Sequence, residues 1–63
     1  MNDHEERVVA EKEQLDEKLD KLSAFMHSNV FGQLHTTDQE LLGMQQHLML
    51  GYSKVLAARI NRF

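Results

Sequence analysis

The stretch from Thr37 to Phe63, TDQELLGMQQHLMLGYSKVLAARINRF, decides the fold because its apolar residues recur at the spacing of a helix face. One apolar set repeats every seven residues and consists of Leu42, Met49, Leu56 and Phe63. A second set follows beside it, namely Leu41, Leu48 and Val55. Seven residues make about two helical turns, so both sets lie along one side of a helix. Thr37 followed by Glu40 is a capping-box pattern, and we therefore predict a helix over about residues 38–62.

The N-terminal half of the chain predicts a second helix over about residues 3–28. Asn2 or Asp3 can cap its start, since Glu5 and Glu6 follow at the spacing of a capping box. Its apolar positions are separated by threes, fours and sevens: Val8, Leu15, Leu19, Leu22 and Met26. Lys12 falls in the same seam, as a snorkelling or register-setting residue. The helix is expected to end near Ser28 or Asn29, because Asn tolerates the left-handed conformation of helix ends.

The connection over residues 29–37 is apolar at Val30, Phe31 and Leu34, which predicts a short turn of helix folded over the end of a hairpin. Two helices of nearly equal length with a short connection form an antiparallel hairpin. The fold class is therefore all-α, with residues 1–63 as one helical-hairpin domain. Further apolar residues widen both stripes beyond one helix partner: Val9, Phe25, Met44, Leu50 and Ile60. We expect this surplus to be buried between chains, in a homo-oligomer.

Composition narrows the function classes. With 63 residues the core is small, and the lack of cysteine excludes disulfides and thiolate zinc sites. The lack of proline and the presence of only three glycines favour long helices. A net charge of −3 does not favour binding to DNA or RNA polymers. No apolar run is long enough to span a bilayer and the polar N-terminus does not resemble a signal peptide, so we expect a cytoplasmic protein.

No residue pattern indicates catalysis. His27 and His35 flank the connection and could bind zinc with Asp38 in principle, but metal sites need three or four converging ligands. No nucleophile stands beside a recognisable base, and there is no Gly-rich phosphate loop. The carboxylates of Asp16, Glu17 and Asp20 are expected on a solvated charged face. We therefore expect no enzyme activity, no metal and no cofactor.

Gly43 and Gly51 interrupt the second predicted helix at a cost of about 1 kcal/mol each relative to alanine. Gly51 and Ala58 are seven residues apart, which would let another helix approach closely. Close packing is preferred here to an approach by a ligand.

A polar line borders the apolar stripe and consists of Gln45, Tyr52 and Arg59. An amide, an aromatic ring and a guanidinium can together bind a base edge, stack on a base and hold a phosphate. The alternative is that Tyr52 and Arg59 form the rim of a helix interface, with apolar bodies packed and polar tips in water. Lys18 and Lys21 could add cations, although Glu17 is placed to pair with Lys21 at i,i+4.

The residues at these positions resemble a family of short bacteriophage proteins, the helical-hairpin sponges that act against CBASS and Thoeris immunity. The pattern comprises Glu11, Leu15, Lys18, Lys21, Leu22 and Phe25, then Phe31 and Leu34, then Leu41, Leu42, Gln45, Met49, Tyr52, Leu56, Arg59 and Ile60. It covers nearly the whole chain. Its single positions have low specificity, whereas the joint set with Phe31, Gln45, Tyr52 and Arg59 is more distinctive.

The resemblance implies a hairpin assembled into a homo-oligomer, often a hexamer, in the host cytoplasm. It implies that the protein binds cyclic oligonucleotides, both cyclic dinucleotides and cyclic trinucleotides, and sequesters them without cleavage. Pockets in that family lie between protomers, with aromatic rings on bases and Lys or Arg on phosphates. The matching candidates here are Lys18, Lys21, Gln45, Tyr52 and Arg59. The alternatives are a small acidic module that binds and inhibits a host enzyme, and a structural oligomer without a ligand.

Overall fold

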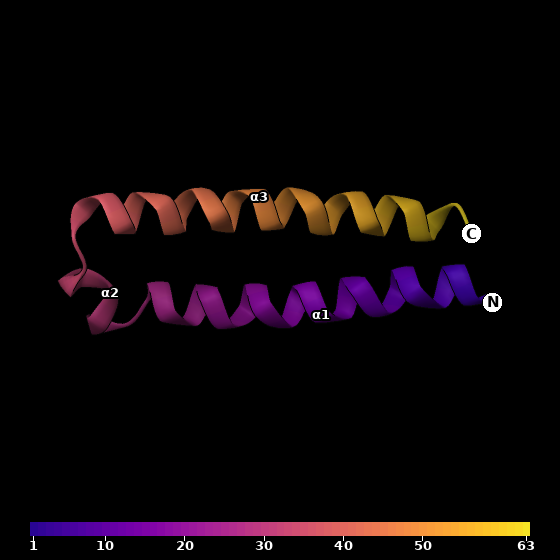
Figure 1. Cartoon of the computed structure of the whole chain (residues 1–63), viewed down its shortest axis with the longest axis horizontal. Coiled ribbons are helices and arrows are strands. Elements are labelled where there is room, and N and C mark those ends of the chain that lie inside the picture. Colours follow the sequence, from indigo (N-terminus) through magenta and orange to yellow (C-terminus); the bar gives the residue numbers. More distant parts are fainter.

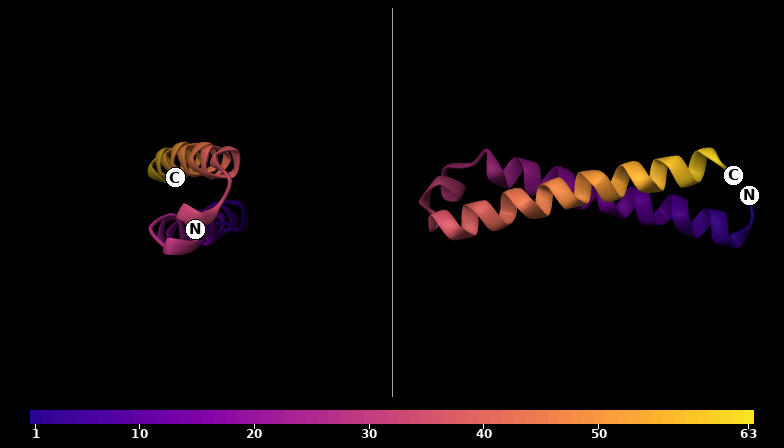
Figure 2. Two further views of the ribbon diagram at one scale, coloured as in Figure 1. Left: turned by 90° about the vertical axis from the view of Figure 1, so that its left-hand side faces the viewer. Right: turned by 90° about the horizontal axis from the view of Figure 1, so that it is seen from above.

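The structure is a computed structural model that describes residues 1–63 and consists of helices alone. The helices are α1 (Asp3–Met26), α2 (Asn29–Gln33) and α3 (Thr36–Asn61). Figure 1 shows α1 and α3 side by side and antiparallel, with α2 at one end and both termini at the other. The long helices cross at a shallow angle (Figure 2), and the molecule measures 46 × 15 × 13 Å. The predicted all-helical class is confirmed.

Local hydrogen bonds determine where each long helix begins. Asn2 caps α1 through a complete capping box: its side chain accepts the Glu5 N–H at 2.9 Å, and Glu5 accepts the Asn2 N–H at 3.1 Å. The predicted capping box of Thr37 with Glu40 is wrong. Instead α3 begins at Thr36, because the Nδ1 atom of His35 accepts the Thr37 N–H at 3.0 Å.

The end of α1 also differs from the prediction. The helix ends at Met26, and no residue of the chain has the left-handed conformation expected near Asn29. Ser28 takes the place of the expected left-handed residue. Its hydroxyl donates to the Phe25 carbonyl at 2.6 Å and also caps α2. Phe31 then packs edge-on against Phe25, with ring centroids 6.2 Å apart. These contacts fold α2 back over the end of the hairpin.

The hydrophobic core lies in the seam between α1 and α3. Its buried residues are Val8, Leu15, Leu19 and Leu56. Leu56 is fully buried, and the partly buried Met49 and Ile60 pack against the cluster. A core of four residues is small even for a chain of this length.

Polar side chains share this seam: Lys12 was expected there and is partly buried, whereas the polar pairs across the hairpin were not expected. Asp16 was expected on a solvated face, but its carboxylate accepts from the Ser53 hydroxyl and from the Lys12 ammonium, each at 2.6 Å. The Lys12 hydrogen bond, then the Ser53 hydroxyl and the Lys12 charge, lower the pKa of Asp16 below its ordinary value. Farther along the seam, Gln46 donates to the Ser23 hydroxyl at 2.9 Å. The two cross-hairpin bonds fix the register of α1 against α3.

Candidate ligand-binding face

One side of α3 exposes a continuous row of large apolar side chains, called the outer stripe below. Its members and their exposed fractions are Leu41 (55%), Met44 (61%), Leu48 (69%), Tyr52 (45%) and Val55 (56%). The structure thus separates the two apolar sets of this helix. Leu42, Met49 and Leu56 turn toward α1, whereas the set with Leu48 remains in solvent. Sequence reasoning placed both sets on one packing surface and missed this division.

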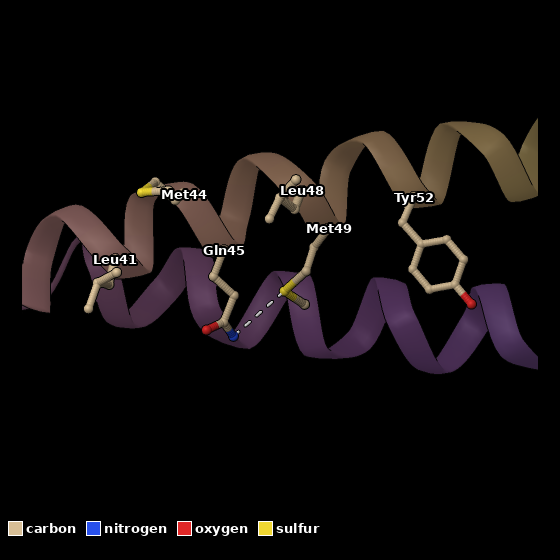
Figure 3. Close-up of a pocket in the computed structure, with 6 residues that line it drawn as sticks. All are labelled: Leu41, Met44, Gln45, Leu48, Met49 and Tyr52. Atoms are coloured by element: carbon tan, nitrogen blue, oxygen red, sulfur yellow. Dashed lines mark hydrogen bonds between the residues drawn. The ribbon is translucent and has the colours of Figure 1, made fainter.

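A shallow groove of about 360 Å³ lies along the outer stripe, open to solvent. Its lining residues are Leu41, Met44, Gln45, Leu48, Met49 and Tyr52 (Figure 3). Gln45, Met49 and Tyr52 reach toward α1, whereas Met44 and Leu48 stay beside α3. The Gln45 amide makes one weak hydrogen bond, to the Met49 sulfur at 3.9 Å, and so retains donors and an acceptor for a ligand.

The hairpin register places Lys18 level with the part of the groove that contains Tyr52. Asp16 bonds Ser53 across the seam, so Lys18 lies level with Gly51 and Tyr52. Lys18 and Tyr52 also lie on the same side of the hairpin. His4 packs on Phe63, with ring centroids 6.5 Å apart; Lys18 follows His4 by four helical turns, and Tyr52 precedes Phe63 by three. An exposed ammonium and a half-exposed aromatic ring therefore share one flank of the hairpin.

The other candidates lie farther along this surface. Lys21 is one turn beyond Lys18 and is exposed, level with Leu48. Arg59 is exposed about 10 Å along α3 from Tyr52, and the line from Gln45 to Arg59 is about 21 Å long. One chain therefore places Gln45 and Tyr52 in one groove with Lys18 level with Tyr52, but it does not gather all five candidates into one pocket.

The candidate cations carry no internal partner. The one salt bridge in the structure joins Lys12 to Asp16, so the expected pair of Glu17 with Lys21 does not form. Lys18, Lys21 and Arg59 are all exposed and keep their charges available to an anion. In chemical terms the face offers an apolar floor, one aromatic ring, one amide and separate cations.

Comparison with protein families identifies the family of the chain. The Sequestin family model matches residues 2–62. The chain belongs to the Sequestin family. This family's name denotes sequestration of a ligand. Comparisons of this Sequestin chain with curated proteins and with solved structures find no match.

The histidines that flank the connection in this Sequestin chain have local structural roles, and the two glycines of α3 have no packing role within the hairpin. His35 caps α3, and His27 Nδ1 donates to the Ser23 carbonyl at 2.7 Å, so both flank the connection as helix-end residues. A Cβ atom added at Gly43 or Gly51 would meet nothing within 4 Å, which means that the hairpin itself does not use either glycine for close packing. Despite the apolar surface of α3, no helix is long and apolar enough to cross a membrane.

Proposed function

We propose that this Sequestin chain is a bacteriophage protein that binds cyclic oligonucleotide second messengers in the host cytoplasm and sequesters them without cleavage. Cyclic dinucleotides and cyclic trinucleotides are the ligand class, and blocking CBASS-type immunity is the consequence. The observation that supports this proposal most is an apolar groove lined by Tyr52 and Gln45, with the exposed Lys18 level with Tyr52 on the neighbouring helix. A base can stack on the ring while the ammonium holds a phosphate.

The energetics favour a homo-oligomer as the binding unit. Base stacking on an aromatic side chain contributes about 1–3 kcal/mol, and one charge-assisted hydrogen bond about 1.5–3 kcal/mol. Micromolar affinity needs about 8 kcal/mol, which one Tyr52 and one Lys18 do not supply. Because the candidate cations are spread along the surface, a second protomer is needed to bring more of them to one ligand.

Isothermal titration with a panel of cyclic di- and trinucleotides tests the proposal. Tyr52→Ala and Arg59→Ala should each weaken binding at least tenfold, because each removes a contact of the size given above. Tyr52→Phe keeps the ring and should bind nearly normally, and Arg62→Ala is the matched control for Arg59. A ligand recovered intact after the protein is heat-denatured would support sequestration. No heat with any member of the panel contradicts the proposal.

A second candidate is an acidic module that inhibits a host enzyme. It is favoured by the charge of α1, which carries eight of the ten acidic residues, with Glu6, Glu13, Glu17 and Asp20 exposed. A lysate pull-down distinguishes the two candidates. A stoichiometric host enzyme whose activity falls on binding would favour the module, whereas bound small molecules favour the sponge. An oligomer that retains neither would be structural.

A further inference from the structure

We propose that the outer stripe of α3 is the face on which a second copy of this chain docks, α3 against α3, antiparallel, with the two-fold axis beside Leu48. This inference specifies the homo-oligomer on which the proposed function rests, but it does not require the ligand. Three independent features of the structure carry it: the surplus surface, the shape of the stripe and the distribution of charge along α3.

The hairpin exposes more surface than a compact protein of its mass. Its accessible surface is 4918 Å², whereas a folded monomer of 7.3 kDa exposes about 4,200 Å². The surplus of about 700 Å² is close to the area of about 800 Å² that each partner buries in a standard interface. The five side chains of the outer stripe, each at least 45% exposed, contribute apolar area to that surplus.

The shape of the stripe fits another helix. Met44 and Leu48 form a ridge with a groove on either side, because both residues line the groove of Tyr52 and also a second groove with Glu40, Gly43 and His47. Helices pack by seating such a ridge in the groove of a partner. A two-fold axis at Leu48 lets each ridge enter a groove of the other copy. A flat ligand alone would leave the second groove open.

The charge pattern sets the direction of the second copy. Asp38 and Glu40 lie at the start of α3, and Lys54 and Arg59 lie near its end. An antiparallel pair centred on Leu48 brings Lys54 within about one turn of the partner's Glu40, and Arg59 within about one turn of the partner's Asp38. A parallel pair would place like charges together. Antiparallel packing is therefore selected by four opposite-charge pairs at the rim.

This register completes the candidate site. Leu41 lies opposite Val55 of the partner subunit, and Tyr52 opposite Met44 of the partner subunit, which offers a sulfur to the ring edge. The open groove beside Tyr52 thereby gains a second wall. Arg59 keeps donors beyond those that a carboxylate occupies, since a guanidinium has five N–H groups. The partner copy thus encloses the groove that one hairpin leaves open.

Single-cysteine crosslinking tests the register, because the chain has no cysteine of its own. Leu48→Cys should crosslink to itself with a short bismaleimide. Leu41→Cys and Val55→Cys should crosslink when mixed but not separately, because copies of one position lie about 21 Å apart in this packing. Crosslinking of Leu41→Cys to itself, or failure of Leu48→Cys, would overturn the proposed register.

Native mass spectrometry and sedimentation without nucleotide test the face. Leu48→Glu puts two carboxylates at the axis and should lower the association constant at least a hundredfold. Leu50→Glu changes the same residue type outside the outer stripe, where Leu50 is 44% exposed; although Leu50 was expected between chains, this packing predicts that the variant keeps the α3–α3 association. A wild-type chain that is monomeric throughout a dilution series starting at about 100 μM would refute the face. An equal loss of association in both variants would refute it too. Cyclic-nucleotide binding is measured separately, so an associating chain that binds no nucleotide contradicts the proposed function alone.

Discussion

The substitution Leu56→Ala tests where the stability of the hairpin resides. Leu56 is the one large side chain that is fully buried, and Val8 and Leu15 belong to the same cluster. Truncating a buried leucine costs about 2–5 kcal/mol, the lost transfer free energy plus the cavity. A chain of 63 residues has a total free energy of unfolding of about 3–9 kcal/mol. The variant should therefore lose about half of its stability or more.

Urea unfolding followed by circular dichroism measures the loss. A destabilisation of 3 kcal/mol at a slope of about 1 kcal/mol/M lowers the midpoint by about 3 M. Leu50→Ala is the matched control, because Leu50 is 44% exposed and should lose about 1 kcal/mol or less. Both variants are compared with wild type at one protein concentration, since association adds a concentration-dependent term. Equal midpoint shifts in the two variants would mean that the core is not in the α1–α3 seam.

Three further predictions concern the seam and the helices. The lowered pKa of Asp16 stabilises the fold above its unfolded value near 3.8 and ceases to do so as pH falls through the folded value. The stability difference between wild type and Asp16→Asn should thus be largest above pH ~5 and shrink below pH ~4. Gly43→Ala should raise the free energy of unfolding in urea by about 0.5–1 kcal/mol, since a methyl group there meets open space within the hairpin; a loss would indicate a contact outside it. Asn2→Ala should cost about 1 kcal/mol and speed hydrogen exchange in the first turn of α1, and unchanged exchange would contradict the capping role.

Helix type and number were predictable from the sequence, whereas helix ends were predictable only in part. The cap of α1 followed from Asn2 and Glu5, which match a known pattern. The start of α3 did not, because His35 is an uncommon cap whose ring nitrogen reaches the Thr37 N–H. The end of α1 was assigned to a left-handed Asn, but Ser28 ends one helix and begins the next through a single hydroxyl. Such choices depend on side-chain geometry, which residue spacing does not contain.

The candidate site was predictable as a set of residue types and not as an arrangement. Heptad spacing puts Tyr52 and Arg59 on one side of α3, and the charge pattern puts Lys18 on the surface of α1. Their relative position along the hairpin axis depends on how α1 is aligned with α3. The hydrogen bonds of Asp16 with Ser53 and of Ser23 with Gln46 fix that alignment. Since polar residues at seam positions read as surface residues in a sequence, neither pair was expected.

Polar pairs in the seam also explain which apolar stripe of α3 turns inward. Both stripes have helical spacing, and hydrophobicity alone would allow the row with Leu48 to pack on α1 just as well. That rotation would withdraw Ser53 from Asp16 and Gln46 from Ser23, forfeiting two hydrogen bonds of about 0.5–1.5 kcal/mol each and leaving polar groups against apolar ones. A hairpin with so small a core is sensitive to a difference of that size. The face with Ser53 and Gln46 is therefore held inside by its hydrogen bonds, and the outer stripe remains outside, available to a second copy and to a ligand.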